Sequence, residues 1–184
     1  KEQINKKKYN RSSVPLWFIK AVEKSRLNLQ DIIENISEEP SLHLVFKKNN
    51  LIDDFKEEYD KTTNLSAFLK NKKQVKDLED YKKGHWWVQD LSSMLPLELS
   101  PEIRSKKVLD MCAAPGGKAF QAISLNNNVI LNDISLKRIK TLSTNLKRLN
   151  FSNKIKNYNA LSIPEDETFD VIILDSPCSG VGTL

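Results

Sequence analysis

Apolar residues in the first half of the chain recur at spacings that change from helical to strand-like. Between residues 16 and 36 they lie three or four positions apart, which predicts one or two amphipathic helices. Residues 41–46 alternate between polar and apolar side chains and predict a short strand, and Asn49-Asn50 predicts a turn. The apolar positions that follow are scattered among Lys, Asp and Glu. Residues 1–83 are therefore predicted to form a small α+β module.

A different pattern begins at residue 84. Asp90 is placed to cap a helix, and three short apolar runs beyond it predict strands, at residues 107–111, 128–133 and 169–175. Helical spacing separates these runs, at residues 118–125 and 135–149, and a further short strand is expected at residues 154–158. This order of strands and helices predicts a parallel sheet with helical crossovers. Residues 84–184 are therefore predicted to be an α/β domain.

Composition narrows the class of protein without deciding it. The chain has 184 residues, and 29 Lys and Arg against 24 Asp and Glu leave a net charge of +5. This balance is compatible with a nucleic-acid partner and with many others. Two cysteines are too few for a disulfide framework and favour a reducing, cytoplasmic setting. No apolar run approaches the roughly 20 residues of a membrane span, so no membrane partner is predicted.

The loop after the first predicted strand is a candidate ligand site, because open α/β sheets bind ligands at the carboxyl ends of their strands. It reads Asp110-Met111-Cys112-Ala113-Ala114-Pro115-Gly116-Gly117-Lys118. Small residues and glycines allow a ligand to approach the backbone, and the N-terminus of the next helix favours an anion. The methionine carboxylate of S-adenosylmethionine is such an anion. The alternative is an ordinary strand–helix turn, which the full string disfavours.

The second loop supplies Asp133, which follows Asp110 by 23 residues. A carboxylate at this place can accept both hydroxyl groups of a ribose. The alternative is a capping role for the helix that starts near Ser135. A dinucleotide cofactor would use the same carboxylate, but the chain has no GxGxxG string.

The third loop, Asp175-Ser176-Pro177-Cys178-Ser179-Gly180, places a thiol at the end of a strand. Carbon 5 of cytosine is a poor nucleophile, and a thiolate that adds to carbon 6 activates it. By this reasoning Cys178 is the nucleophile and Asp175 hydrogen-bonds or protonates the base ring. The alternative for Cys178 is a small buried side chain. For Cys112 packing is the preferred interpretation.

The strings at residues 110–118 and 175–180 together resemble the RNA cytosine-5 methyltransferases, the Sun/Fmu and NOL1/NOP2 group, and most of all its bacterial branch that acts on 16S rRNA. Residues 14–17, 88–93 and 145–149 add to the resemblance, which is loose before residue 84 and close after it. It implies a Rossmann-like methyltransferase domain preceded by an RNA-binding module. It also implies S-adenosylmethionine as cofactor and RNA as partner, with ribosomal RNA favoured over transfer RNA.

The resemblance further implies contacts from residues 112–118 to the cofactor, from Asp133 to its ribose and from Asp175 near the methyl-transfer site. Asn159 stands where the family has Asp and would still hydrogen-bond the adenine amino group through its oxygen. Ala119 stands where the family has Thr.

The resemblance also reassigns Cys178, which would promote elimination and product release, while the covalent nucleophile lies in a later motif. The chain ends at Leu184, before that motif. We therefore expect a fragment of a longer enzyme that does not turn over by itself.

Two other functions stay open at this level: an oxidoreductase with a nucleotide cofactor, and a non-catalytic RNA-binding relative. Trp86 and Trp87 could stack on RNA bases, although core packing is the preferred interpretation for them and for Trp17. His43 and His85 have no companions at metal-ligand spacing, so no metal site is predicted.

Overall fold

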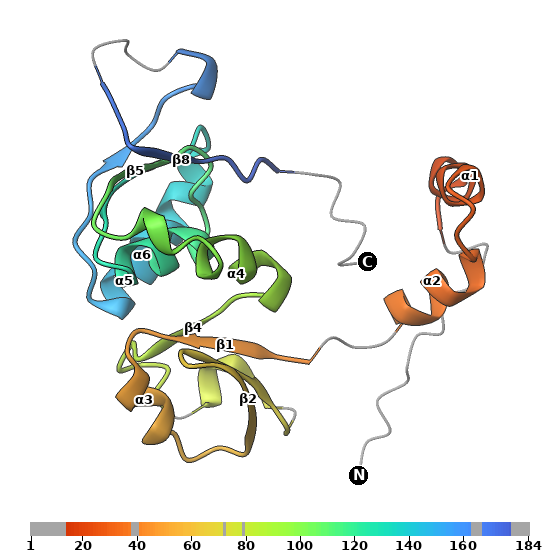
Figure 1. Ribbon diagram of the computed structural model, residues 1–184, viewed down its shortest axis with the longest axis horizontal. Helices are drawn as coiled ribbons and strands as arrows, with labels where there is room; N and C mark the ends of the chain where they lie inside the picture. Colours follow the sequence, from red (N-terminus) through yellow and green to blue (C-terminus); the bar gives the residue numbers. More distant parts are fainter. Residues whose placement is uncertain (1–13, 38–40, 72, 79, 163–166, 178–184) are drawn as a thin grey trace. The chain divides into compact units, whose positions relative to one another are not determined.

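The computed structural model of the protein describes residues 14–37, 41–71, 73–78, 80–162 and 167–177. By their contacts these residues form two compact units (Figure 1). The first comprises residues 14–37, and the second comprises the described residues between 41 and 177. The predicted division of the chain between residues 83 and 84 stays a prediction.

The first unit is a pair of short helices, α1 (Leu16–Lys24) and α2 (Leu29–Ser37), which confirms the helical prediction. Its small core is formed by Val14, Ile19 and Ile33. The prediction that Trp17 belongs to a core is wrong within this unit, because 56% of its surface is exposed. The buried positions of α1 are Ile19 and Val22, three residues apart, and the helical period turns Trp17 away from them.

The second unit begins with an antiparallel sheet, sheet A, in the strand order β2-β3-β1-β4. Its strands are β1 (His43–Phe46), β2 (Tyr59–Thr63), β3 (Ser66–Leu69) and β4 (Trp86–Val88). The predicted strand at residues 41–46 is confirmed. The predicted turn at Asn49-Asn50 is wrong, because these residues start the helix α3 (Asn49–Asp53), which buries Ile52 beside sheet A. A single 3₁₀ turn, η2 (Val75–Asp77), precedes β4.

The parallel sheet, sheet B, has the order β7-β6-β5-β8. Its strands are β5 (Lys107–Asp110), β6 (Asn128–Asn132), β7 (Ile155–Lys156) and β8 (Val171–Ile173). The helices of this region are α4 (Leu91–Glu98), α5 (Gly117–Ser124) and α6 (Leu136–Leu149), with 3₁₀ turns η3 (Pro101–Ile103) and η4 (Ala160–Ser162). The predicted α/β arrangement is confirmed, and it is a Rossmann-like methyltransferase fold.

The order of sheet B creates a switch point between β5 and β8. The chain runs outward from β5 through α5 to β6 and through α6 to β7, and then returns to the other side of β5 to form β8. The loops that follow β5 and β8 therefore diverge at the carboxyl edge of the sheet. In doubly wound sheets this crevice is where ligands bind.

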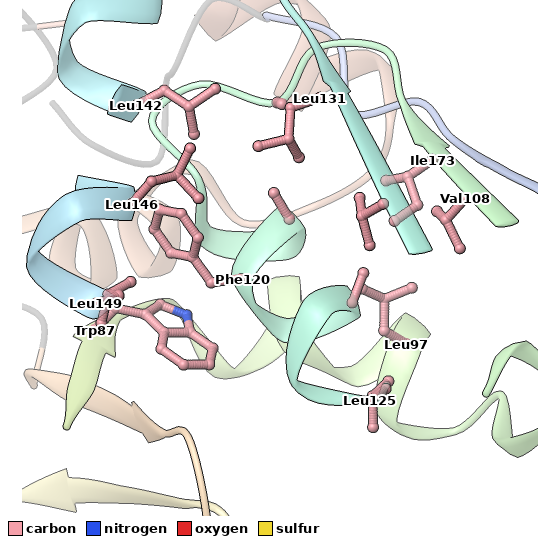
Figure 2. Packing of buried hydrophobic residues seen from close by; sticks show 14 of the residues in the cluster. Trp87, Leu97, Val108, Phe120, Leu125, Leu131, Leu142, Leu146, Leu149 and Ile173 are labelled. Carbon is pink, nitrogen blue, oxygen red and sulfur yellow. The ribbon is translucent and has the colours of Figure 1, made fainter. Parts of the chain in front are cut away.

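Sheets A and B share apolar cores through two strands of sheet A. On β4, Trp86 packs with Phe46 in the core of sheet A, whereas Trp87 packs with Val45 in the core around sheet B. Because neighbouring residues of a strand point to opposite faces, β1 and β4 belong to both cores. Both tryptophans are buried, which confirms core packing for them. Phe120 of α5 lies between Trp87 and Leu146 of α6 (Figure 2).

Gly84, which lies just before β4, packs against the backbone at the C-terminal end of α6. Gly84 has φ +69°, and a Cβ there would lie 1.9 Å from the carbonyl oxygen of Arg148. We predict that Gly84→Ala lowers the free energy of unfolding by about 2–4 kcal/mol, because left-handed strain adds to a backbone clash. Urea titration measures the change.

Gly117→Ala is the matched control for that prediction. A Cβ at Gly117 would meet Gln89 at an ordinary 3.5 Å, so the free energy of unfolding should change by less than about 1 kcal/mol. Equal losses in the two variants would contradict the proposed clash at Gly84.

Candidate active site

The candidate site lies at the switch point, where β5 and β8 end side by side. Asp110 pairs with Ile173 in register, and the amide of Met111 donates to the carbonyl oxygen of Ile173 at 2.9 Å. The next residues of each strand lead into the loops singled out in the sequence. The structure thus brings the first loop and residues 175–177 of the third loop to one crevice. Cys178, which was expected in the third loop, lies outside the described residues.

The loop after β5 is fastened to the neighbouring strand and helix. The amide of Ala113 donates to the carbonyl oxygen of Asn132 at 2.8 Å, and the side chain of Asn145 on α6 donates to the carbonyl oxygen of Pro115 at 3.1 Å. Arg138, also on α6, donates to the carbonyl oxygen of Ala114. The backbone of the loop is therefore held by a main-chain hydrogen bond to β6 and by two side chains of α6.

Gly116 is required by the protein's own packing. Its φ is +127°, and a Cβ there would lie 1.9 Å from the Phe120 ring. Sequence reasoning gave close approach of a ligand as the purpose of this glycine, whereas the structure supplies an internal reason. Gly116 is also the N-cap residue of α5, and no side chain caps this end of the helix. The first amide groups of α5 therefore remain available to an anionic group.

Lys118 joins three elements at the crevice. Its Nζ donates to Ser93 Oγ at 2.6 Å and to Asp175 Oδ2 at 2.8 Å. The Lys118 side chain is mostly buried, while that of Asp175 is 62% exposed. Ser93 lies in the first turn of α4, where Asp90 accepts its amide. Asp175 is thus an accessible carboxylate with a fixed cation beside it.

Ser93 is a site residue that sequence reasoning missed. The signal in the sequence was its place in residues 88–93, which contributed to the family resemblance but did not indicate a role for the Ser93 hydroxyl. Asp90 was predicted to cap a helix, and this prediction is confirmed by the hydrogen bonds that its carboxylate accepts from the amides of Ser92 and Ser93. The cap holds the first turn of α4 in the position where Ser93 meets Lys118.

Asp110 is the most perturbed acid of the site. Burial is the main cause that raises the pKa of its carboxyl to about 7; the amide of Cys112, 3.3 Å from Oδ1, opposes the shift, and the nearby Asp175 contributes to it. The group is therefore half-protonated near neutral pH.

Asp133 is buried, and both of its carboxylate oxygens are engaged. Oδ1 accepts the amide of Ser135 at 2.9 Å, and Oδ2 accepts the amide of Ala114 at 3.3 Å and lies 3.4 Å from Nη2 of Arg138. The capping alternative for Asp133 has support, since Oδ1 accepts the amide of Ser135, while Ser135 itself caps α6 by accepting the amide of Arg138. A ribose would reach this carboxylate only if one of these contacts opened, so the ribose role stays a prediction.

The half-buried thiol of Cys112 is poorly suited to attack a substrate. Burial raises its pKa, and the carboxylates of Asp133 and Asp110 raise it further. A thiol with a raised pKa stays protonated at neutral pH, and the thiolate is the reactive form. This agrees with the preference for a packing or backbone role at this position.

Two asparagines behind the crevice were also missed. Asn132 is buried; its Nδ2 donates to the carbonyl oxygens of Met111 and Tyr158, and its Oδ1 accepts the amide of Tyr158. It therefore ties together the chain segments that follow β5 and β7. Asn157 donates to the carbonyl oxygen of Asp133 at 2.7 Å. A polar residue at the end of an apolar run was the signal available in the sequence.

Asn159, the predicted adenine contact, lies after β7 and is exposed. Its Oδ1 accepts the amide of Leu161 at 3.0 Å, in a local turn. Tyr158 and Leu161, near Asn159 in the sequence, have exposed apolar side chains, and so does Ile134, which follows the neighbouring strand β6. An adenine role for Asn159 would require its amide to exchange this local bond for one to the ligand.

Other candidates in the described residues have structural partners. His43 is buried, with Nδ1 2.7 Å from the carbonyl oxygen of Gln89 and Nε2 2.9 Å from Thr62 Oγ1. Within the described ranges, His, Cys, Asp and Glu form no group of three or more that could hold a metal ion. No helix among those ranges is long and apolar enough to span a membrane.

The Asp110 carboxyl makes stability depend on pH in a defined direction. In the unfolded chain it is ionised above about pH 4, whereas in the folded protein it keeps its proton up to about pH 7. The folded state therefore binds more protons in this window, and its stability falls as the pH rises from 4 to 7.

We predict that Asp110→Asn removes the loss of folding stability between pH 4 and 7, which is roughly 4 kcal/mol. The Asn side chain keeps an oxygen that can accept the Cys112 amide. The measurement is the difference in free energy of unfolding between variant and wild type across pH 4–8. It should grow in favour of the variant up to pH 7 and then level off. A difference that does not vary with pH would contradict the assignment.

Comparison with known proteins gives a consistent family. Residues 94–184 match the family model of the 16S rRNA methyltransferase RsmB/F. The chain is 39% identical over 112 residues to the ribosomal RNA small subunit methyltransferase B of Photorhabdus laumondii, a match that covers 58% of this chain and 26% of that protein.

A second relative covers more of the chain. The ribosomal RNA small subunit methyltransferase B of Shewanella oneidensis is 30% identical over 190 residues, which covers 94% of this chain and 44% of that protein. Among solved structures, NSun6 from Pyrococcus horikoshii with SFG is 29% identical with a TM-score of 0.53, over 62% of this chain and 32% of that one. The chain thus spans less than half the length of these relatives. Residues 94–184 of the chain are similar to the RsmB/F methyltransferase family.

Proposed function

We propose that the protein containing this chain transfers a methyl group from S-adenosylmethionine to carbon 5 of a cytosine in ribosomal RNA. The observation that carries the proposal is the pairing of Lys118 with an exposed Asp175 at the switch point. This pair stands beside the loop at residues 112–118, in a chain whose relatives are named for methylation of ribosomal RNA. We include in the proposal a reducing, cytoplasmic setting.

S-adenosylmethionine supplies the electrophilic methyl group. The residues present fit this cofactor: the uncapped first turn of α5 suits its carboxylate, and the fastened loop at residues 112–118 offers backbone groups. SFG, bound by the related NSun6, is an analogue of S-adenosylmethionine. We assign the ribose to Asp133 and the adenine amino group to Asn159. Asp133 must then exchange one of its present contacts for the ribose.

Asp175 is proposed to act on the base. Its carboxylate is accessible, and Oδ2 lies 2.8 Å from Nζ of Lys118. Such a group, in its acid form, can hydrogen-bond or protonate the cytosine ring as the ring becomes nucleophilic at carbon 5. Ser93 and Lys118 would hold the carboxylate in one orientation. We propose that Cys178 promotes product release, as the resemblance implies.

Ribosomal RNA is preferred over transfer RNA because both small-subunit relatives carry it in their names. A transfer-RNA methyltransferase is the alternative substrate class. A non-catalytic RNA-binding relative is the alternative without chemistry, and the substitution of Asp by Asn159 is the feature that favours it.

The cofactor is tested by calorimetric titration of the full-length gene product with S-adenosylmethionine and, separately, with NAD. We expect binding of S-adenosylmethionine alone. Binding of NAD alone would favour an oxidoreductase, and RNA binding without either ligand would favour the non-catalytic relative.

The role of Asp175 is tested by Asp175→Asn. We expect the rate of methyl transfer to ribosomal RNA, followed with labelled S-adenosylmethionine, to fall about 10²–10⁴-fold, while cofactor affinity changes by less than about threefold. Asp77→Asn, which removes an exposed acid of η2, is the matched control and should keep the rate. An unchanged rate in Asp175→Asn would overturn the assignment.

A further inference from the structure

A hollow of about 170 Å³ lies within the second unit between sheet A, the loop after β5 and α6. Its walls include Tyr81 and Val88 from the sheet A side, Pro115 and Gly117 from the loop, and Asn145 and Arg148 from α6. None of the roles assigned above uses Tyr81, Val88 or Arg148. The hollow nevertheless shares two loop residues with the candidate cofactor site, so a ligand in it would lie against the same loop.

The walls offer flat, stacking surfaces. The guanidinium of Arg148 lies 4.3 Å from the centroid of the Tyr81 ring. Its Nη1 donates to the carbonyl oxygens of Tyr81 and Trp86, at 2.9 and 3.1 Å, which holds the guanidinium plane in place. Trp87 and Phe120 complete an apolar floor. Aromatic rings and arginine planes are the surfaces on which single-stranded nucleic acids stack their bases.

The charge of the hollow favours an anionic ligand. Arg148 supplies a cation, and no acidic residue lines the walls. The Nε of Arg148 is buried and has no hydrogen-bond partner among the described residues. A buried donor without an acceptor costs free energy. Lys147 is exposed beside it on α6.

We propose that this hollow receives one unstacked base of the RNA substrate, with a neighbouring phosphate beside Arg148 and Lys147. The choice of RNA rests on the proposed function, whereas the stacking geometry and the charge do not. A bound base would pack against the loop after β5 from the side of sheet A. RNA docking and the candidate cofactor loop would then be in direct contact.

The test is to enlarge one side chain that lines the hollow and to measure the affinity for RNA. Val88 is 44% exposed and lies on β4, an edge strand, so its side chain can be enlarged without entering a core. Val88→Phe is expected to weaken binding of a fluorescein-labelled 12-nucleotide single-stranded RNA by about 5- to 30-fold, because stacking of one base is lost. Val88→Ala, which leaves the hollow open, should bind within about twofold of wild type.

An abasic scan separates base insertion from a general effect. One nucleotide at a time is replaced by an abasic sugar, and the affinity is measured with wild type and with Val88→Phe. We expect one position, or a short run, to weaken binding to wild type and to have no further effect on Val88→Phe. Equal affinity of Val88→Phe and wild type for intact RNA would overturn the proposal, as would an abasic penalty that is identical in the two proteins.

Two controls keep the outcome decisive. Thermal unfolding shows whether Val88→Phe is folded. If it is not, Val75→Phe replaces it in the same titrations, because Val75 of η2 also lines the hollow. Titration with S-adenosylmethionine should give the same affinity for Val88→Phe and wild type. Failure of wild type to bind the cofactor would count against the proposed function, while the RNA titrations would still decide the role of the hollow.

Discussion

The packing of Phe120 beneath Gly116 is the contact on which the site depends. The ring occupies the space that a Cβ at residue 116 would need, so the loop after β5 can turn into α5 only with glycine there. The same ring packs edge-on against Trp87 of β4, with centroids 5.8 Å apart, and stacks on Phe151 at 6.1 Å. One aromatic residue thus connects the candidate cofactor loop, the antiparallel sheet and the end of α6. A change in any of these would be transmitted to the loop by direct contact.

Three carboxylates at the carboxyl edge of sheet B are stabilised in three different ways. Asp110 is buried and holds a proton near neutral pH. Asp133 is buried too, but two amides and the guanidinium of Arg138 satisfy its charge. Asp175 is exposed and paired with Lys118. This division leaves Asp175 as the accessible carboxylate among the three.

The comparison of prediction with structure shows where local pattern is enough. The strands around residues 107–111 and 128–133 were predicted from short apolar runs, and the helix at 135–149 was predicted from its helical period. The Asn49-Asn50 turn failed because these residues begin α3, which places Ile52 in the core beside sheet A, and that tertiary contact has no signal in the two asparagines. Trp17 failed because its burial depended on which face of α1 meets α2, a choice that its apolar neighbours Leu16 and Phe18 did not reveal.

The sequence by itself determined the alternation of strands and helices after residue 84, the loop at residues 110–118 and the acidic residues at the strand ends, since these follow from local periodicity and residue type. Tertiary structure alone decided that Ser93 meets Lys118 and that Phe120 requires Gly116. It also decided that Asp110 is buried enough to hold its proton, and that the guanidinium of Arg148 lies against the Tyr81 ring beside the hollow. These contacts join residues distant along the chain or on different elements, and their geometry depends on how whole elements pack. No local pattern carries that information.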